Sequence, residues 1–268
     1  MGRRISDADG LVPAALKEAD LFAAWPDEVR DKLSAAAQLW EYGKGEAVTE
    51  VGSDPQGIYV IVSGALLNER TWANGKRLLM GILRPGWALK LAATWDGYEH
   101  PHGLTARVDS TVILIPRAAF LDAVRGNAEL ISQITDFVCY QYRAELTRIN
   151  IITCGSIRLQ IAAFLIFYLT DAQLVLQDVP PSPEQYPIRL ADVTQEELSA
   201  ICGYSRQEVN RVMKSMIDEG ILRRVGRLVE VVRYDLLLEC LEEDEPLSDE
   251  WRQKFAAWQE SVAISVDD

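Results

Sequence analysis

The sequence predicts an α+β fold in three parts: an N-terminal antiparallel jelly roll, one long helix, and a C-terminal helix-turn-helix with a two-stranded wing. Between Trp40 and Pro116, β-branched and aromatic runs alternate with glycine turns about every ten residues, which is typical of small antiparallel barrels. Residues 128–152 carry an apolar side chain at every third or fourth position, as an amphipathic helix does. Residues 194–216 read as two short helices that are joined at Gly203.

The composition is that of an ordinary soluble protein with room for two modest domains. The chain has 268 residues, of which 49% are hydrophobic and 25% are charged. No apolar run approaches the roughly 20 residues that a membrane span needs, and the N-terminus lacks the apolar core of a signal peptide. We therefore expect a cytoplasmic protein without a membrane partner. The net charge of −13 argues against wholesale coating of nucleic acid but allows a local basic face.

The cysteines and the other reactive residues form no recognisable chemical site. The four cysteines, at positions 139, 154, 202 and 240, lie among apolar neighbours and form no C-x-x-C pair. They predict reduced, structural thiols and no metal site. The sequence also contains no recognisable Ser/His/Asp set and no phosphate-cradling glycine loop, so we expect the protein not to be an enzyme.

Several local signals divide the N-terminal part into elements. Residues 11–40 have a helical period of apolar side chains. The dipeptide Asn74-Gly75 between two apolar runs predicts a tight hairpin. The stretch from Leu104 to Pro116 is interpreted as one strand, because apolar and β-branched residues dominate it.

The apolar stripe of the long helix is nearly continuous, from Leu130 to Ile149. A stripe of this length exceeds what packing against one domain requires. It therefore predicts a seam between two copies of the chain. The alternative is ordinary packing of the helix against the strand-rich domain.

Residues 194–216, TQEELSAICGYSRQEVNRVMKSM, carry the signals of two capped helices. Thr194 and Ser205 are favoured N-cap residues, and Gly203 suits the left-handed turn between the helices. Burial of the apolar face leaves polar side chains outward near the start of the second helix: Arg206, Gln207, Asn210 and Arg211. Arginine pairs with guanine, and the amide side chains pair with adenine, so this face predicts base reading in duplex DNA.

This order of parts resembles the CRP/FNR family of bacterial transcription regulators, the cyclic-AMP receptor protein type. Two stretches carry the resemblance. The first, GKGEAVTEVGSDPQGIYVIVSGAL at residues 43–66, is similar to the opening hairpins of a cyclic-nucleotide-binding domain. Its turns are expected at Gly45, Gly52 and Gly64. The other is residues 194–222, which follow the DNA-binding motif of the family from end to end. The resemblance implies four regions: an effector domain (1–125), a dimerisation helix (126–153), a winged helix-turn-helix domain (154–240) and an acidic C-terminal extension (241–268).

The resemblance implies a homodimeric transcription regulator that binds double-stranded DNA at a palindromic site. Arg206, Gln207 and Arg211 stand at the base-reading positions of the family. Phosphate contacts, which position the protein without reading sequence, are expected from Thr194, Ser205 and Lys214. RNA polymerase is a candidate partner. The alternative is a ligand-binding or protein-interaction module of the same fold that has lost DNA binding.

The sequence departs from the family at the effector site. Members that bind cyclic AMP carry a Gly-Glu pair for the ribose and a downstream Arg-Ser or Arg-Thr pair for the phosphate. Here Trp87 follows Gly86, and Gly103 follows His102, so we expect that cyclic AMP does not bind. Aromatic and cationic residues form the candidate effector pocket: Trp87, Lys90, His102 and Arg107.

Three alternative occupants of this pocket are compatible with the sequence. The first is an aromatic or hydrophobic acid, and the second is the side chains of the pocket itself. The third is haem bound through His100 or His102, the two histidines of the chain. No cofactor is assigned.

Overall fold

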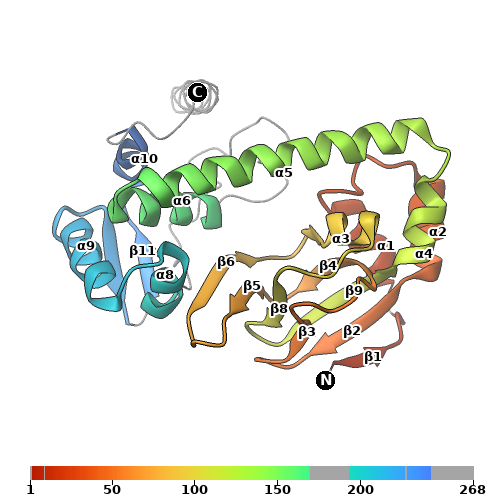
Figure 1. Ribbon diagram of the computed structural model, residues 1–268, viewed down its shortest axis with the longest axis horizontal. Coiled ribbons are helices and arrows are strands. Elements are labelled where there is room, and N and C mark those ends of the chain that lie inside the picture. Colours follow the sequence, from red (N-terminus) through yellow and green to blue (C-terminus); the bar gives the residue numbers. More distant parts are fainter. Residues whose placement is uncertain (1, 9, 170–192, 227, 243–268) are drawn as a thin grey trace. The chain divides into compact units, whose positions relative to one another are not determined.

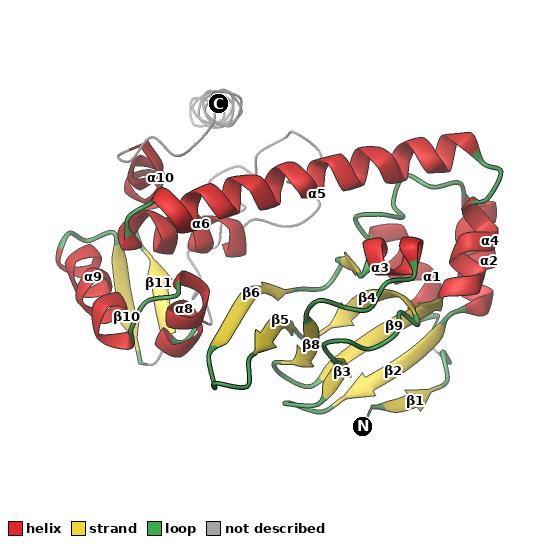
Figure 2. Ribbon diagram, viewed as in Figure 1, coloured by secondary structure: helices red, strands yellow, loops and turns green. Residues whose placement is uncertain are grey.

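The computed structural model describes residues 2–8, 10–169, 193–226 and 228–242. The chain divides into two compact units, Met1–Gln141 and Tyr142–Asp268. The first unit is rich in strands, and the second is helical with one small sheet (Figures 1 and 2). The predicted fold class is thereby confirmed. The acidic extension predicted at 241–268 lies outside the described residues beyond position 242.

Two antiparallel sheets form the first unit. One sheet contains, in spatial order, β1 (Arg3–Ile5), β2 (Gln38–Tyr42), β9 (Ser110–Pro116), β4 (Gly57–Ser63) and β7 (Ala88–Leu89). The other sheet contains β3 (Ala47–Thr49), β8 (Gly103–Ala106), β5 (Leu66–Thr71) and β6 (Arg77–Leu83). Strands far apart in the sequence are neighbours, such as β2 beside β9, which distinguishes a jelly roll from a simple meander.

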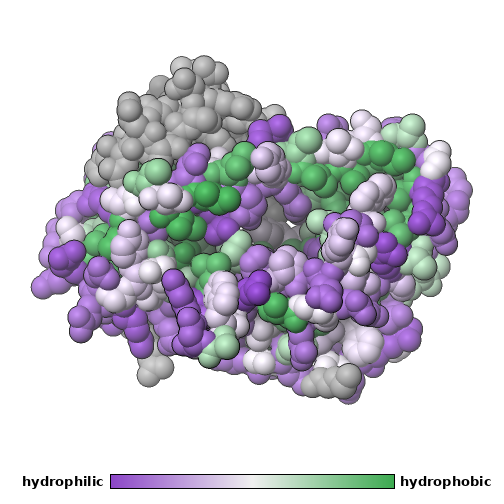
Figure 3. All heavy atoms as spheres, viewed as in Figure 1, coloured by the Kyte–Doolittle hydropathy of each residue, from purple (hydrophilic) through white to green (hydrophobic). Residues whose placement is uncertain are grey.

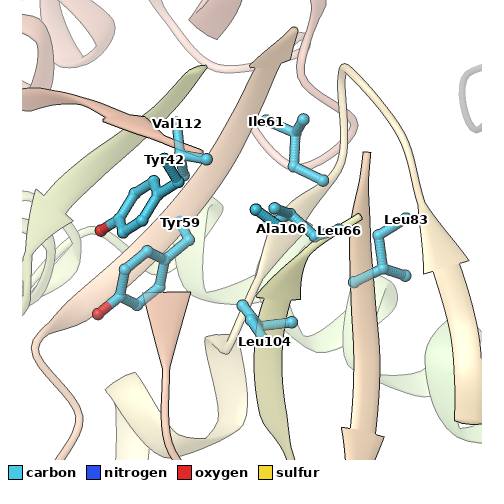
Figure 4. Close-up of a cluster of buried hydrophobic side chains, with 8 residues drawn as sticks. All are labelled: Tyr42, Tyr59, Ile61, Leu66, Leu83, Leu104, Ala106 and Val112. Carbon is cyan, nitrogen blue, oxygen red and sulfur yellow. The ribbon is translucent and has the colours of Figure 1, made fainter. Parts of the chain in front are cut away.

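The core of this roll lies between the two sheets (Figure 4). The five-stranded sheet contributes Tyr42, Tyr59, Ile61 and Val112, and the four-stranded sheet contributes Leu66, Leu83, Leu104 and Ala106. Leu66 and Leu104 are 0% and 1% exposed, so the sheets are held together by the removal of apolar surface from water. In Figure 4 the rings of Tyr42 and Tyr59 lie at one end of the cluster, with their hydroxyl groups pointing the same way.

The predicted turn glycines are in turns. Gly45, Gly52 and Gly64 have positive φ angles of 84°, 77° and 86°. A β-carbon at Gly64 would lie 2.3 Å from Ser110 Oγ and 2.6 Å from the carbonyl oxygen of Asp109, so both backbone and space require glycine there. The hairpin predicted at Asn74-Gly75 is confirmed, because it connects β5 to β6.

Two predicted elements are wrong in their bounds. Residues 11–40 form two helices, α1 (Leu11–Glu18) and α2 (Asp27–Ala36), followed by strand β2. Pro26 precedes α2 in extended backbone, which starts that helix and separates it from α1. The predicted single strand 104–116 is two strands, β8 and β9, because the chain turns after Ala106 and crosses from one sheet to the other.

Aromatic rings pack the N-terminal segment against the roll. The rings of Phe22 and Trp25 meet edge to face at 4.9 Å, and Trp25 stacks at 6.0 Å on Phe120 of α4 (Arg117–Val124). Arg30 of α2 donates from Nη1 to the carbonyl oxygens of Phe22 at 3.2 Å and Ala23 at 2.8 Å. These bonds satisfy backbone groups between α1 and α2, so the segment is an ordered part of the first unit.

The predicted long helix is present as α5 (Ala128–Cys154), whose 27 residues span roughly 40 Å. Leu130, Ile134 and Phe137 are buried. A second stripe of apolar side chains is exposed, from 38% for Ile131 to 63% for Tyr142: Ile131, Val138, Tyr142, Leu146 and Ile149. Figure 3 likewise shows hydrophobic residues gathered along the course of α5.

The second unit is organised around an apolar helix. Its further elements are α6 (Ile157–Leu169), α8 (Gln195–Cys202), α9 (Arg206–Asp218), β10 (Leu222–Val225), β11 (Leu228–Val231) and α10 (Tyr234–Glu242). Leu159, Ile161 and Leu165 of α6 are fully buried, and α6 contacts α8, α9 and α10. Within the described residues, no helix is both long enough and apolar enough to cross a membrane.

Asp20 ties the N-terminal helices to the strand β7. Its Oδ1 accepts the backbone N–H of Leu21 at 2.7 Å and that of Ala88 at 2.8 Å. Its own N–H donates to the carbonyl oxygen of Gly86 at 2.9 Å. Burial raises the pKa of Asp20 to about 7, and the two N–H bonds oppose that rise.

This raised pKa predicts a pH dependence of stability. The folded chain keeps the Asp20 proton where the unfolded chain has lost it, so the contribution of Asp20 is present below about pH 4 and is lost as the pH rises through about 7. Urea unfolding between pH 4.5 and 7.5 should show this loss in the wild type and not in Asp20→Asn. The exposed control Asp54→Asn should follow the wild type, and coinciding profiles for all three proteins would contradict the assignment.

Candidate functional site

Helices α8 and α9 each begin with a capping box. The Thr194 hydroxyl accepts the N–H of Glu197 at 3.2 Å, and the Glu197 carboxylate accepts the N–H of Thr194 at 2.7 Å and its hydroxyl at 3.0 Å. Ser205 and Glu208 repeat this pattern at 3.3, 3.0 and 2.6 Å. Both predicted N-caps are present, and together the boxes fix the first turns of the two helices.

The turn between the helices also follows the expected chemistry. Gly203 has a φ of 71°, and its N–H donates to the carbonyl oxygen of Ser199 at 2.9 Å. The Ser199 hydroxyl donates to the carbonyl oxygen of Tyr204 at 2.5 Å. The left-handed glycine therefore ends α8 and directs the chain into the cap of α9.

The exposed face of α9 carries the predicted base-reading side chains. Val209, Met213 and Met216 are buried, and they fix which side of the helix faces inward. The residues predicted to contact DNA bases all remain exposed: Arg206, Gln207, Asn210 and Arg211. Lys214, one turn further along, is exposed as well. A guanidinium or amide on this face is free to approach a planar set of acceptors and donors.

Each of the two arginines has a carboxylate nearby. Arg206 Nη1 lies 4.0 Å from Oε2 of Glu196, in the first turn of α8. Hydrogen bonds from Ser205, and then the charge of Arg211, hold the pKa of Glu208 below its usual value. Glu196 and Glu208 were not among the predicted site residues. The sequence signal that points to them is their position in the first turn of each helix.

The β10–β11 hairpin, which forms the wing, adds two arginine side chains to the charged residues of this unit. Strands β10 and β11 pair antiparallel, with Leu222 opposite Val231 and Val225 opposite Leu228. Arg223 donates to Glu230 at 2.5 Å across this hairpin, whereas Arg224 donates to the carbonyl oxygen of Gly226 at 3.2 Å. Arg223 and Arg224 are exposed, and sequence analysis had not assigned them to a site.

The predicted effector residues are distributed around the start of helix α3 (Leu91–Asp96). Lys90 precedes α3 with a φ of 69°, which makes it a non-glycine residue in left-handed backbone. Its Nζ donates to the carbonyl oxygen of His102 at 2.7 Å, so the structure joins these two predicted residues. Trp87 packs against the core cluster of the roll, and Arg107 lies in the turn between β8 and β9.

His100 is the unexpected member of this region. Its side chain is 1% exposed, and neither ring nitrogen has a hydrogen-bond partner in the described part of the chain. Burial and the charge of Lys90 lower the pKa of His100 to about 4, and burial lowers the pKa of Lys90 to about 8. An ammonium and an imidazole are thus withdrawn from water, and burial is the cause of the lowered pKa of Lys90.

The comparisons with known proteins match both units. Residues 39–127 match the model of the cyclic nucleotide-binding domain, and residues 160–240 match the model of the Crp-like helix-turn-helix domain. A Thermus thermophilus protein named cyclic AMP receptor protein is 23% identical over 84% of this chain and 97% of its own length. A Mycobacterium tuberculosis protein named CRP-like cAMP-activated global transcriptional regulator is 20% identical over 80% of this chain and 92% of its own length.

Solved structures share the fold. FixK2 of Bradyrhizobium japonicum superposes with a TM-score of 0.63 at 16% identity, over 76% of this chain and 96% of its own. The Xanthomonas campestris regulator CLP, described as responsive to c-di-GMP, superposes with a TM-score of 0.60 at 14% identity, over 77% of this chain and 99% of its own. At such identities the likeness establishes the fold alone.

Proposed function

The chain belongs to the CRP/FNR family of transcription regulators, and from this premise we propose that it is a homodimer that reads a palindromic DNA site through α9. The family consists of DNA-binding regulators, which are not enzymes. The observation that carries the proposal is the exposed Arg206, Gln207, Asn210 and Arg211 face on a helix whose start is fixed by a capping box. In this proposal, residues 1–125 form the effector domain and residues 154–240 bind DNA.

The chemistry of the α9 face supports direct reading of the major groove. Arg206 and Arg211 offer paired N–H donors to guanine O6 and N7, and Gln207 and Asn210 suit adenine. Two copies related by a two-fold axis would read half-sites about 34 Å apart. Phosphate contacts are best supported for Lys214 and Arg224, which are exposed. The hydroxyls of Thr194 and Ser205 support this role less, because each already donates to a glutamate.

The DNA-reading proposal predicts a large loss of specific affinity in Arg206→Ala/Arg211→Ala. Each lost bidentate contact costs about 1–3 kcal/mol, so the dissociation constant should rise at least about thirtyfold. Fluorescence anisotropy would measure it on a duplex that the wild type selects from a random library, at several salt concentrations. The exposed control Arg125→Ala should bind like the wild type. Binding without salt dependence or sequence preference would instead favour a ligand-binding module that has lost DNA recognition.

The exposed stripe of α5 supports the dimer. Five apolar side chains at spacings of three, four or seven residues along one helix form a seam suited to a second copy: Ile131, Val138, Tyr142, Leu146 and Ile149. Exposed apolar patches of this kind on soluble proteins mark interfaces. A second copy presents the same stripe, so the two helices can bury each other.

We expect Ile149→Asp to dissociate the dimer. The carboxylate would be buried once in each protomer, so the dissociation constant should rise roughly a hundredfold. Sedimentation equilibrium over a range of protein concentrations would measure it. The control Asp136→Asn changes an exposed charge on another face of α5 and should remain dimeric. An unchanged dissociation constant of the dimer in Ile149→Asp would show that α5 is not the dimer interface.

We further propose that the effector of the first unit is a small acid with an apolar body and not cyclic AMP. Gly86 and Lys90 both have left-handed backbone, the conformation that favours glycine, so a Gly-Glu pair can correspond to Gly86-Trp87 or to Lys90-Leu91. Neither register supplies the glutamate for a ribose. Lys90 and His100 supply cationic and hydrogen-bonding groups without a carboxylate partner, and Trp87 supplies an aromatic wall.

This effector proposal predicts a pH-dependent response to an aromatic carboxylate. Benzoate should raise the thermal midpoint of the wild type below pH 8, and the effect should fade above it as Lys90 loses its proton. Lys90→Leu should lose the effect, whereas the exposed control Lys76→Leu should keep it. Differential scanning fluorimetry with benzoate and with cyclic AMP makes the comparison. Stabilisation by cyclic AMP and none by benzoate would refute the proposal.

A further inference from the structure

The DNA-facing side of the helix-turn-helix carries fixed negative charge beside its arginines. Glu196 is 65% exposed and Arg206 is 64% exposed, with 4.0 Å between carboxylate and guanidinium. Glu208 is also exposed, two residues beyond Arg206 and three before Arg211. Because residues three positions apart are neighbours on a helix surface, Glu208 and Arg211 share one face. Glu197, the other glutamate of these first turns, is only 8% exposed.

Glu208 occupies the place where an anion would otherwise bind. Helix N-termini attract phosphate because their first N–H groups have no partner within the helix. Here the Glu208 carboxylate accepts the Ser205 N–H at 3.0 Å and the Ser205 hydroxyl at 2.6 Å, and its charge balances the positive end of α9. A DNA phosphate that approached this end would meet the negative charge of the Glu208 carboxylate.

The two carboxylates affect specific and non-specific complexes unequally. A non-specific complex is held by attraction between cations and phosphates, and that attraction is the same for every sequence. An acid beside each arginine weakens it. In a specific complex the guanidinium gives two of its five N–H donors to a guanine, and its remaining donors are still available to the carboxylate. The carboxylate then holds the guanidinium in position and does not compete with the base.

We propose that Glu196 and Glu208 are specificity-determining residues, which hold Arg206 and Arg211 for base reading and repel phosphates so that non-specific binding is weakened more than specific binding. The inference rests on the proposed function, because it assumes that α9 reads DNA. A repulsive element that penalises the wrong partner is a general route to specificity. The overall charge of −13 acts at long range on all DNA, whereas these two carboxylates act at the contact itself.

The test compares Glu196→Gln, Glu208→Gln and the double variant with wild type. Glutamine at the third helical position still completes a capping box, so Glu208→Gln keeps the start of α9. Glu196→Gln changes no capping bond, so it provides a variant whose fold is not at issue. Asp218→Asn removes one exposed charge at the far end of α9, about 18 Å along the helix from Arg206, and serves as the matched control.

The readout is the ratio of two dissociation constants, measured by anisotropy for a duplex that the wild type has selected and for a scrambled duplex of equal composition. In the double variant, the constant for scrambled DNA should fall about fourfold to twenty-five-fold, since each exposed charge contributes about twofold to fivefold and the two factors multiply. The constant for the selected duplex should change less than about twofold. Asp218→Asn should leave the ratio unchanged.

The outcomes separate this inference from the proposed function. A wild type that selects no sequence from the library refutes DNA reading itself, and this inference with it. A wild type that selects a site, together with a double variant that binds both duplexes more tightly by the same factor, refutes only the role of the carboxylates. Loss of affinity for the selected duplex in Glu196→Gln, with no gain on scrambled DNA, refutes it as well.

Discussion

The backbone N–H groups at the starts of α8 and α9 must find acceptors, and the exposed face of α9 depends on how this chain supplies them. Unsatisfied N–H groups at a helix start favour fraying or capture of an external anion. In this chain a hydroxyl and a glutamate three residues later satisfy two of these N–H groups at each start. The same carboxylates therefore complete the helix starts and add to the local negative charge. At the start of α9, Glu208 therefore contributes both to the geometry of the helix and to its local charge.

In the roll, the backbone conformation of Lys90 depends on packing against the core. Trp87 and Leu89 pack against the cluster between the sheets, and Lys90 follows directly with left-handed backbone. For a side chain larger than glycine this conformation costs roughly 1–2 kcal/mol. The packing of β7 on one side and the bond to His102 on the other hold it there. Such stored strain is typical of sites where a ligand is received.

The parts predicted well from sequence are those with local causes. The caps at Thr194 and Ser205, the glycine turns and the long helix each follow from signals within a few residues. The split between α1 and α2 was also visible in Pro26, which the helical period of residues 11–40 obscured. The crossing from β8 to β9 and the burial of His100 follow from contacts with distant segments. No local pattern at His100 predicts that its backbone will bond to residues 52 and 53.

The bonds of Asp20 make the beginning of the chain a structural part of the roll. The turn before Lys90 takes one hydrogen bond from the Asp20 backbone and gives one to its side chain. A shortened protein, such as one translated from a later start codon, would therefore lack two of the contacts that order this turn. Gene boundaries drawn a few dozen bases too late would yield a chain with an intact helix-turn-helix and an altered strand-rich unit.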